Sequence, residues 1–225
     1  MQFHHDLIEL PRLERIDSPA GRRYRTPSGV LYPSVTTVIG HCSDKSGLEE
    51  WKKRVGEEEA AKVSARAARR GTEVHRLCED LVLNRPIDLR REMPINAQMF
   101  GQIRRELEAD MTDVRGSELF LYSDRLKVAG ACDLIASYRN KKSIIDFKTS
   151  TSMKSWEWIH GYFIQTSLYS FMFWERTGIY HGQLVVVIAV ESETNAQVFI
   201  ESASDWINKA QDMCKRYHSE VNLAG

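Results

Sequence analysis

The chain has only four cysteines, and no two of them stand close together. Structural zinc sites and iron–sulfur clusters usually take at least one close pair of ligands from a single loop, so this spacing argues against both. Cys78 and Cys132 lie in apolar surroundings and are expected to be reduced residues of the core. Reduced cysteines in turn indicate a cytoplasmic location.

The sequence also lacks any apolar stretch of the roughly 18 residues that a membrane-spanning helix needs. Its first six residues, MQFHHD, contain no basic segment followed by an apolar run, so no secretory signal is expected. An acidic residue so early is also atypical of a transit peptide. We therefore expect no membrane partner.

Neither sign of charge is in excess, because 31 Lys and Arg balance 31 Asp and Glu. Proteins that only coat nucleic acid are usually basic, so this balance counts against that class. An enzyme that grips its substrate in one local groove is not excluded. No repeat, low-complexity tract or Pro-, Gly- or Ser-rich linker divides the 225 residues, and this length favours one domain, residues 1–225.

The N-terminal part of the chain is predicted to be helical between about residues 34 and 112. A short hairpin around Pro27-Ser28-Gly29 precedes it, at residues 22–33. A long helical pattern runs from about Leu48 to Leu83. Gly71 is expected to break this pattern, with Thr72 capping a second helix.

The period of the pattern changes after Gly116, where strands begin to alternate with helices. The remaining elements are expected to be a helix at 95–111, strands at 118–123, 127–138 and 143–148, a buried helix at 157–176, strands at 183–190 and 197–201, and a helix at 203–217. The strand at 183–190 is apolar throughout, as in a sheet covered on both faces. We therefore predict an α/β domain in which a mixed central β-sheet, at about 116–201, is flanked by helices.

Two of the predicted strands contain acidic residues that interrupt apolar runs. Asp133 lies in the strand 127–138, which is otherwise apolar or small on both faces. In the strand 143–148, alternation places Asp146 and Lys148 on one face, roughly 6–7 Å apart. Burying an unpaired carboxylate costs several kcal/mol, so these acids need compensation. Lys148 could bridge them as a structural ion triad, or a divalent cation could bind there while Lys148 serves a bound water.

Three other features point to a site, although each has a structural alternative. His75 lies on a helix, where a single histidine is more often structural or exposed, but beside two carboxylates it can be a metal ligand. Gln165 and Tyr169 lie one turn apart on a buried helix, as core packing or as part of a site. Glu118 opens the strand before that of Asp133 and is either solvated or a further carboxylate.

In chain order these residues form the pattern GxxxH, E, GxxD, DxK and QxxxY. The four longer motifs are Gly71-Thr72-Glu73-Val74-His75, Gly130-Ala131-Cys132-Asp133, Asp146-Phe147-Lys148-Thr149-Ser150 and Gln165-Thr166-Ser167-Leu168-Tyr169. The chain resembles the PD-(D/E)XK nucleases, in their RecB-like exonuclease branch, over about residues 30 to 200. The segment Pro33-Ser34-Val35-Thr36 is similar to one in mitochondrial genome maintenance exonucleases and related phage exonucleases. The resemblance implies a restriction-endonuclease-like fold.

The same resemblance implies a metal site and a catalytic lysine. Asp133 and Asp146 would bind Mg²⁺ or Mn²⁺, hard cations that prefer carboxylate oxygens. His75 and the main-chain carbonyl of Phe147 would complete the site, with Glu118 as a further carboxylate.

The catalytic roles follow by position in the motifs. Lys148 would orient or deprotonate the attacking water, while Gln165 and Tyr169 would hold the lysine or the nucleic-acid backbone. Asp133 lacks the preceding proline of the family's motif, which is a departure from the pattern.

Basic and polar residues near these motifs are candidates for binding the nucleic acid. Lys62, Arg66, Arg69 and Arg70 have helical spacing and form either a solvated face or a phosphate track leading to His75. The other candidates are Ser34 and Thr36 at a helix start, Thr149, Ser150 and Lys154 after the catalytic strand, Trp156 with Trp158 as stacking residues, and Arg22, Arg23 and Arg25 on the hairpin.

We therefore expect a metal-dependent DNA exonuclease that prefers single-stranded DNA or free ends and acts in replication, recombination or DNA processing. No recognition helix or zinc-finger spacing occurs, so no sequence specificity is expected. A flap or junction endonuclease on the same fold, or an inactive DNA-binding member, remain alternatives. The compact chain without an appended helicase fits a phage enzyme in the host cytoplasm. Strand polarity, DNA against RNA and oligomeric state stay open.

Overall fold

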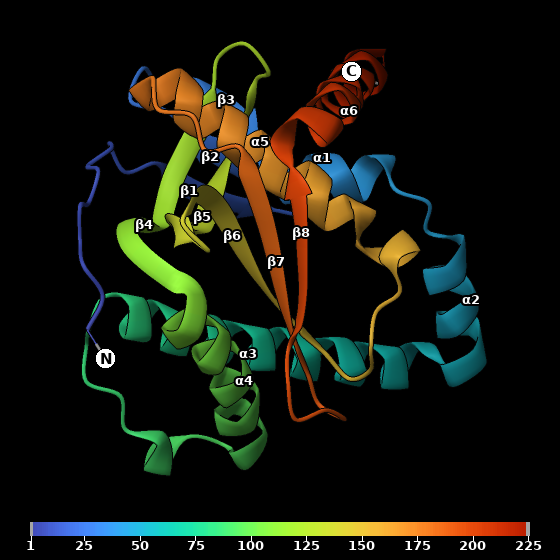
Figure 1. Ribbon diagram of the computed structural model, residues 1–225. Coiled ribbons are helices and arrows are strands. Elements are labelled where there is room, and N and C mark those ends of the chain that lie inside the picture. The colour runs from blue at the N-terminus through green and yellow to red at the C-terminus, as the bar shows by residue number, and fades with distance from the viewer. Residues whose placement is uncertain (1, 224–225) are drawn as a thin grey trace.

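The computed structural model describes residues 2–223 and has a five-stranded mixed sheet at its centre (Figure 1). The strands are β4 (Met111–Ser123), β5 (Val128–Tyr138), β6 (Lys141–Ser150), β7 (Gln183–Val190) and β8 (Gln197–Ser202), in the order β4-β5-β6-β7-β8. Strands β4, β5 and β6 pair antiparallel, β6 pairs parallel with β7, and β7 pairs antiparallel with β8. The predicted mixed sheet is confirmed.

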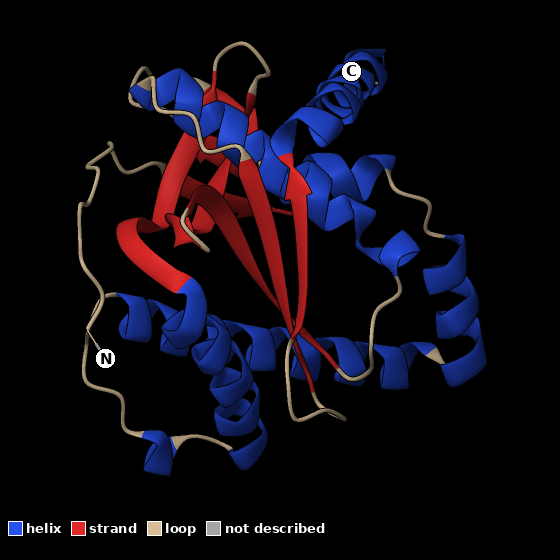
Figure 2. Ribbon diagram, in the orientation of Figure 1, coloured by secondary structure: helices blue, strands red, loops and turns tan. Residues whose placement is uncertain are grey.

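Helices cover both faces of this sheet, as Figure 2 shows. One face carries α1 (Val35–Cys42), α5 (His160–Thr177) and α6 (Ala203–Leu223), and the other carries α3 (Glu57–Val82) and α4 (Pro94–Asp110). Alternate residues of each central strand enter the two cores: Ile144 and Val186 pack with α5, while Ile145 and Val185 pack with α3 and α4. This double coverage explains why β7 is apolar on both faces.

The hairpin between β5 and β6 fixes the register of the two strands that contain the acidic residues. Arg139 and Asn140 form its turn, and both have left-handed backbone conformations, with φ of 49° and 61°. Two such residues in a two-residue loop match the twist of an antiparallel hairpin. The turn aligns Tyr138 with Lys141 and Leu134 with Ile145.

The predicted break in the long helical pattern is wrong in position. Helix α3 runs without interruption through Gly71, and Thr72 Oγ1 donates to the carbonyl of Ala68 instead of capping a new helix. A glycine inside a helix costs only about 1 kcal/mol, which packing of α3 on the sheet offsets. The chain breaks at Gly56, which has a φ of 87° and separates α2 (Ser46–Val55) from α3.

The N-terminal region is not only helical, because it contains a three-stranded antiparallel sheet. Its strands are β1 (Glu14–Ser18), β2 (Gly21–Arg25) and β3 (Leu31–Pro33). The predicted hairpin is the β2–β3 pair, whereas β1 was not predicted, since its sequence ERIDS is mostly polar. Tyr24 and Tyr32 of this small sheet pack on Ala129 of β5.

Two short 3₁₀ helices complete the fold. They are η1 (Leu89–Arg91) and η2 (Trp156–Ile159), and η2 forms the start of the predicted helix 157–176. Within residues 2–223, no helix is both long enough and apolar enough to cross a bilayer.

Candidate active site

The candidate site lies where the ladder between β5 and β6 stops. The two strands pair from Tyr138 and Lys141 as far as Leu134 and Ile145, so Asp133 and Asp146 would be the next pair in register. Beyond that point the backbone N–H of Phe147 donates to Asp133 Oδ2 at 2.8 Å.

The carbonyl of Phe147 faces the same opening, because the N–H and C=O of a strand residue point to the same side. His75 Nε2 lies 2.9 Å from this carbonyl oxygen. Polar side chains therefore replace the missing ladder partners of Phe147.

His75 reaches this opening from α3 on one face of the sheet. Its Nδ1 lies 3.5 Å from Asp133 Oδ2. Burial alone would lower the pKa of His75, but the Asp133 carboxylate outweighs it and raises that pKa to about 9. Burial alone would raise the pKa of Asp133, yet the His75 imidazole holds it below its usual value. Without a cation, the pair is an imidazolium and a carboxylate at neutral pH.

Glu118 is the third member of this cluster. Ser117 pairs with Leu134 and Leu119 with Cys132, so Glu118 stands opposite Asp133. Its φ of 48° lies in the left-handed region that a side chain rarely adopts. Burial, followed by the charge of Asp133, raises the pKa of Glu118 to about 7. This position is strained and desolvated, which indicates a local constraint rather than an ordinary solvated strand end.

Ligand atoms of His75, Glu118 and Asp133 all lie within 4.8 Å of one another, and the three side chains are partly exposed. Two carboxylates and an imidazole suit a hard or borderline divalent cation. A cation would relieve the crowding of two negative groups that share a desolvated site. The residues present therefore fit the metal that the motifs imply.

Asp146 and Lys148 extend from β6 toward α5, on the opposite face of the sheet from α3. Asp146 is 1% exposed, with Oδ2 2.5 Å from Lys148 Nζ and Oδ1 accepting from Gln165 Nε2 at 2.9 Å. Burial raises the pKa of Asp146 to about 6, although Lys148 acts against this shift. The buried amide of Gln165 therefore has its hydrogen-bond partner in Asp146.

Tyr169 lies one turn further along α5 and explains the glycine of the GxxD motif. A Cβ on Gly130 would lie 2.9 Å from Tyr169 Cε1, closer than real contacts allow. Glycine at this position of β5 lets the ring pack directly on the strand. Tyr169 is almost fully buried and forms part of the wall of the cleft.

A cleft of about 740 Å³ opens above these residues. The predicted residues that line it are Ser34, Thr36, His75, Glu118, Asp133, Lys148, Gln165 and Tyr169. Ser34 caps α1 by accepting from the N–H of Thr37 at 2.9 Å, and the exposed Thr36 follows in the first turn of the helix. The N-terminus of α1 thus faces the cleft, as expected from the sequence.

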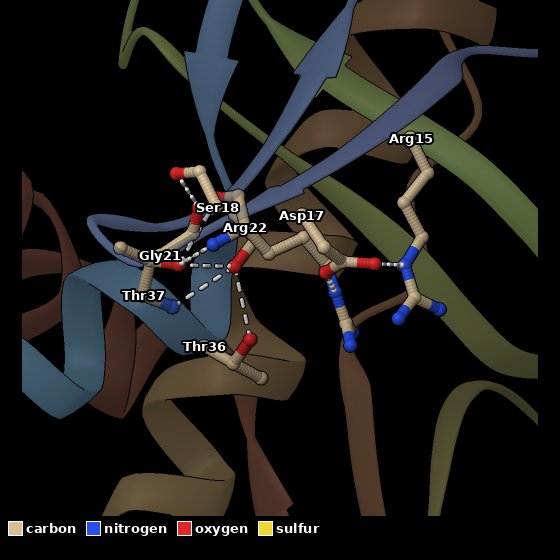
Figure 3. Close-up of polar contacts among 8 residues, drawn as sticks. Arg15, Asp17, Ser18, Gly21, Arg22, Thr36 and Thr37 are labelled. Carbon is tan, nitrogen blue, oxygen red and sulfur yellow. Dashed lines mark hydrogen bonds and ion pairs between the residues drawn. The ribbon is translucent and has the colours of Figure 1, made fainter.

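Three arginines of the N-terminal region, Arg12, Arg15 and Arg22, also line the cleft. Figure 3 shows Asp17 between two of them: Arg15 Nε donates to its Oδ2 at 2.8 Å and Arg22 Nε to its Oδ1 at 2.9 Å. Arg22 was a candidate on the predicted hairpin. Arg12 and Arg15 were missed, because no pattern in the polar N-terminal segment indicated that β1 would fold against the cleft.

The predicted basic track on α3 does not line the cleft. Lys62, Arg66 and Arg69 are exposed on the N-terminal half of the helix, and Lys62 Nζ pairs with Glu58 at 2.7 Å. Arg70 is only 9% exposed and its Nη1 donates to Glu191 Oε2 at 2.9 Å. This guanidinium is buried and paired with Glu191, so Arg70 does not belong to an exposed phosphate-binding track.

The candidates at the end of β6 and in the loop that follows it have mixed surroundings. Ser150 Oγ donates to the carbonyl of Ser152 at 2.6 Å, which shapes the loop that follows β6. Thr149 lies beside α3, where its Oγ1 would be 3.8 Å from a Cβ on Gly71. Lys154 is partly exposed on the loop, while Trp156 packs against other aromatic rings.

Comparison with known proteins finds no matching family model. Mitochondrial genome maintenance exonuclease 1 of Xenopus tropicalis is 29% identical over 147 residues, covering 62% of this chain and 41% of the relative. The human protein of the same name is 27% identical over 155 residues, covering 63% and 44%. The chain thus spans less than half the length of the curated relatives it matches. These matches confirm the resemblance that the motifs predict.

A solved structure of a proposed exonuclease from Eubacterium rectale covers 66% of this chain and 66% of its own, with a TM-score of 0.44 and 14% identity. The assignment of the fold rests on the sheet order and its covering helices, described above.

Proposed function

We propose that the chain is a metal-dependent nuclease that hydrolyses phosphodiester bonds in DNA. The observation that carries the proposal is the opening between β5 and β6, where each of two neighbouring carboxylates has its own cationic partner. Lys148 pairs with Asp146, and His75 pairs with Asp133. A purely structural triad would instead place Lys148 between both acids, and it would give no reason for a third carboxylate, Glu118, beside them.

The metal would be Mg²⁺ or Mn²⁺, held by His75, Glu118 and Asp133 together with the carbonyl of Phe147. Asp146, expected from the sequence as a ligand, is instead paired with Lys148 and Gln165, so we propose it as the neighbouring acid. When bound, such an ion polarises a phosphoryl oxygen and lowers the pKa of a coordinated water. His75 would release the proton that it carries in the free protein, since a metal ligand must be a neutral imidazole.

Lys148 would act as a fixed cation beside the reacting groups. Burial alone would lower its pKa, but Asp146 and Asp133 raise it above the usual value, so the ammonium keeps its proton at neutral pH. A protonated Lys148 orients the attacking water and offsets charge on the scissile phosphate, which favours this role over that of a base. Gln165 holds the Asp146 carboxylate in place, and Tyr169 closes the wall beside it.

The substrate would be a DNA strand lying in the cleft without base-specific contacts. Arg12, Arg15 and Arg22 line the same cleft as the proposed catalytic groups, and guanidinium groups suit phosphate oxygens. Both curated relatives are named exonucleases, which supports action at free ends. We further propose that the protein prefers single-stranded DNA and acts in replication, recombination or DNA processing. A flap or junction endonuclease is the alternative.

End-labelled oligonucleotides test this proposal directly. Single- and double-stranded forms, with free or blocked ends, are incubated with the protein in Mg²⁺, in Mn²⁺ and in EDTA. We expect stepwise shortening of free-ended single strands with either metal and none in EDTA. Cleavage in EDTA would contradict the metal site.

Closed circular single-stranded DNA separates the exonuclease from the endonuclease. We expect the circle to remain intact while a linear strand of the same sequence is degraded. Rapid linearisation of the circle would replace the exonuclease by the endonuclease. An Asp146→Asn protein, prepared in parallel, shows whether any cleavage comes from a contaminant.

A further inference from the structure

The loop between β6 and α5 is fixed to the body of the protein at two points. Gln197 of β8 holds it through paired bonds: its Oε1 accepts from the N–H of Lys154 at 2.7 Å, and its Nε2 donates to the Lys154 carbonyl at 3.0 Å. Two residues later, Trp156 packs 5.4 Å from the ring of Phe163 and 6.3 Å from that of Trp206. The backbone on this side of the catalytic strand is therefore well anchored.

Trp158 lies within this anchored segment but points its indole into solvent. It is 71% exposed, against 39% for Trp156, while the next residue, Ile159, is fully buried. The ammonium of Lys154 lies 5.5 Å from the centroid of the Trp158 ring. A large aromatic ring that is exposed on an anchored backbone contributes little to the core and leaves its face free to pack on a ligand.

The position of Trp158 relates it to the candidate active site. Trp158 lies in η2, just before α5 begins, and Tyr162, Gln165 and Tyr169 follow on one face of α5. Lys148 Nζ lies 5.1 Å from the centroid of the Tyr162 ring, and Gln165 bonds Asp146. Trp158 thus lies close in the chain to the residues that contact the catalytic lysine and acid.

We propose that Trp158 stacks on an unpaired base of the substrate strand and that Lys154 contacts the adjacent phosphate. This inference rests on the proposed function and assigns the stacking role to Trp158 in place of Trp156, which the aromatic cluster occupies. The loop backbone is already held by Gln197 and by the packing of Trp156, so it loses little freedom when the strand binds. Stacking of this kind favours single-stranded over paired DNA, since paired bases have no free face.

Trp174 provides a matched control in the helix that follows η2. It is 41% exposed and lies near the C-terminal end of α5, with its ring 5.7 Å from that of Phe171. Trp158 immediately precedes the N-terminal end of α5, so almost the whole length of this helix separates the two indoles. Loss of Trp174 removes an exposed indole without touching the catalytic end.

The experiment measures binding in a protein that does not cleave. In an Asp146→Asn background with Mg²⁺, fluorescence anisotropy gives the Kd of single-stranded oligonucleotides in which one abasic site is moved along the strand. If Trp158 stacks on a base, the abasic site weakens binding at one position, by about 5- to 150-fold, the equivalent of ~1–3 kcal/mol. Adding Trp158→Ala removes this dependence on position, whereas adding Trp174→Ala keeps it.

The outcomes separate the two proposals. If the Trp158→Ala protein binds and its Kd depends on the position of the abasic site as before, the stacking assignment is overturned, while the proposed nuclease function still stands. Absence of binding by every variant, together with no cleavage by the unmodified protein, contradicts the proposed function itself. Lys154→Gln tests the phosphate contact: it should reduce the slope of log Kd against log salt by about 0.7, the value for one phosphate of a single strand. An unchanged slope removes Lys154 from the contact.

Discussion

The two edges of β6 differ in a way that explains where the site forms. On one edge, β6 pairs with β7 through eight consecutive residues, from Ser143 to Ser150. On the other edge, it pairs with β5 only as far as Ile145. The continuous edge satisfies every backbone group and is surrounded by apolar side chains. The interrupted edge leaves Phe147 without ladder partners, and the charged groups of the protein's core gather there.

In this protein, the candidate site forms where backbone pairing between two strands is missing. The sheet loses ladder hydrogen bonds at Phe147, and the side chains of Asp133 and His75 replace them. Those same side chains line the cleft and can bind a ligand, whereas backbone groups paired within the sheet cannot. Changes on the open edge should therefore affect chemistry, and changes on the closed edge should affect stability.

The largest expected effect is on cleavage at the open edge. Asp146→Asn keeps the shape of the buried side chain but removes its charge, and we expect cleavage to fall by about 10³-fold or more, the equivalent of ~4 kcal/mol, because the metal loses a neighbouring negative charge and Lys148 loses the carboxylate that holds it. Lys148→Met should have a similar effect. Initial rates on an end-labelled single strand, with the circular dichroism spectrum as a check of folding, measure it.

The matched variant on the closed edge is Val186→Ala, since Val186 stands opposite Asp146 in the register of β6 and β7. Truncating this fully buried valine should lower the free energy of unfolding by about 2 kcal/mol and leave the rate per folded molecule unchanged. Cleavage by Asp146→Asn at the rate of the unmodified protein would contradict this division of roles between the two edges. So would a folded Val186→Ala protein that no longer cleaves.

Gly130→Ala should disturb the open edge through packing. The added methyl group would lie 2.9 Å from Tyr169, so we expect a loss of about 1–3 kcal/mol in unfolding free energy by urea titration. Gly161→Ala is the control, because its Cβ would lie 3.7 Å from Ile39, an ordinary contact. Equal stability of the two variants would show that the ring of Tyr169 moves aside without cost.

The stability of the metal-free protein should fall as the pH rises from about 6.5 to 9. The pKa of His75 is raised from 6.5 to about 9 in the folded state, so its contribution is complete below 6.5 and is lost as the pH rises through 9. Urea unfolding in EDTA should show a loss of ~2 kcal/mol across this range. Metal affinity should change in the opposite direction, since binding needs the neutral imidazole.

A His75→Gln protein is the control for this pH dependence. It should lose less stability and gain less metal affinity than the unmodified protein between these pH values, because only the titration of Glu118, whose pKa burial raises to about 7, remains. A wild-type protein whose stability is constant from pH 6.5 to 9 would show that the His75–Asp133 pair is not formed as described.

The smallest effect is expected for Gln165→Ala. Asp146 would lose one of its two partners and keep Lys148, so cleavage should fall by about tenfold, the equivalent of ~1–1.5 kcal/mol for one hydrogen bond to a charged group. The rate at saturating DNA measures it. An unfolded Gln165→Ala protein would indicate that the side chain serves core packing instead.

Much of the fold and part of the site could be predicted because they depend on local periodicity. The alternation of SIIDFK places Asp146 and Lys148 on one face, and the structure has them in contact. The apolar run of β7 similarly predicts a strand covered on both faces, which the two cores confirm. Such patterns are set within a few residues and need no knowledge of the partner.

Other features could not be predicted, because they depend on contacts between distant segments. Gly71 alone favours a break in α3, yet packing on β6 keeps the helix intact. Arg70 has the spacing of a surface track, but Glu191, 121 positions later, holds it in a buried pair. Trp156 and Trp158 are equivalent by sequence, and only the packing of the aromatic cluster distinguishes the anchored ring from the exposed one.

The sequence by itself determined which residues carry charge inside the sheet and on which face of β6 they stand, because strand geometry leaves alternate side chains no choice of face. The tertiary structure alone decided that the pairing of β5 with β6 ends at Leu134 and Ile145. It also decided that α3 presents His75 to the carbonyl of Phe147, and that β1 and β2 contribute arginines to the lining of the cleft. Those outcomes depend on long-range packing of whole elements, whose free energy no short stretch of the chain contains.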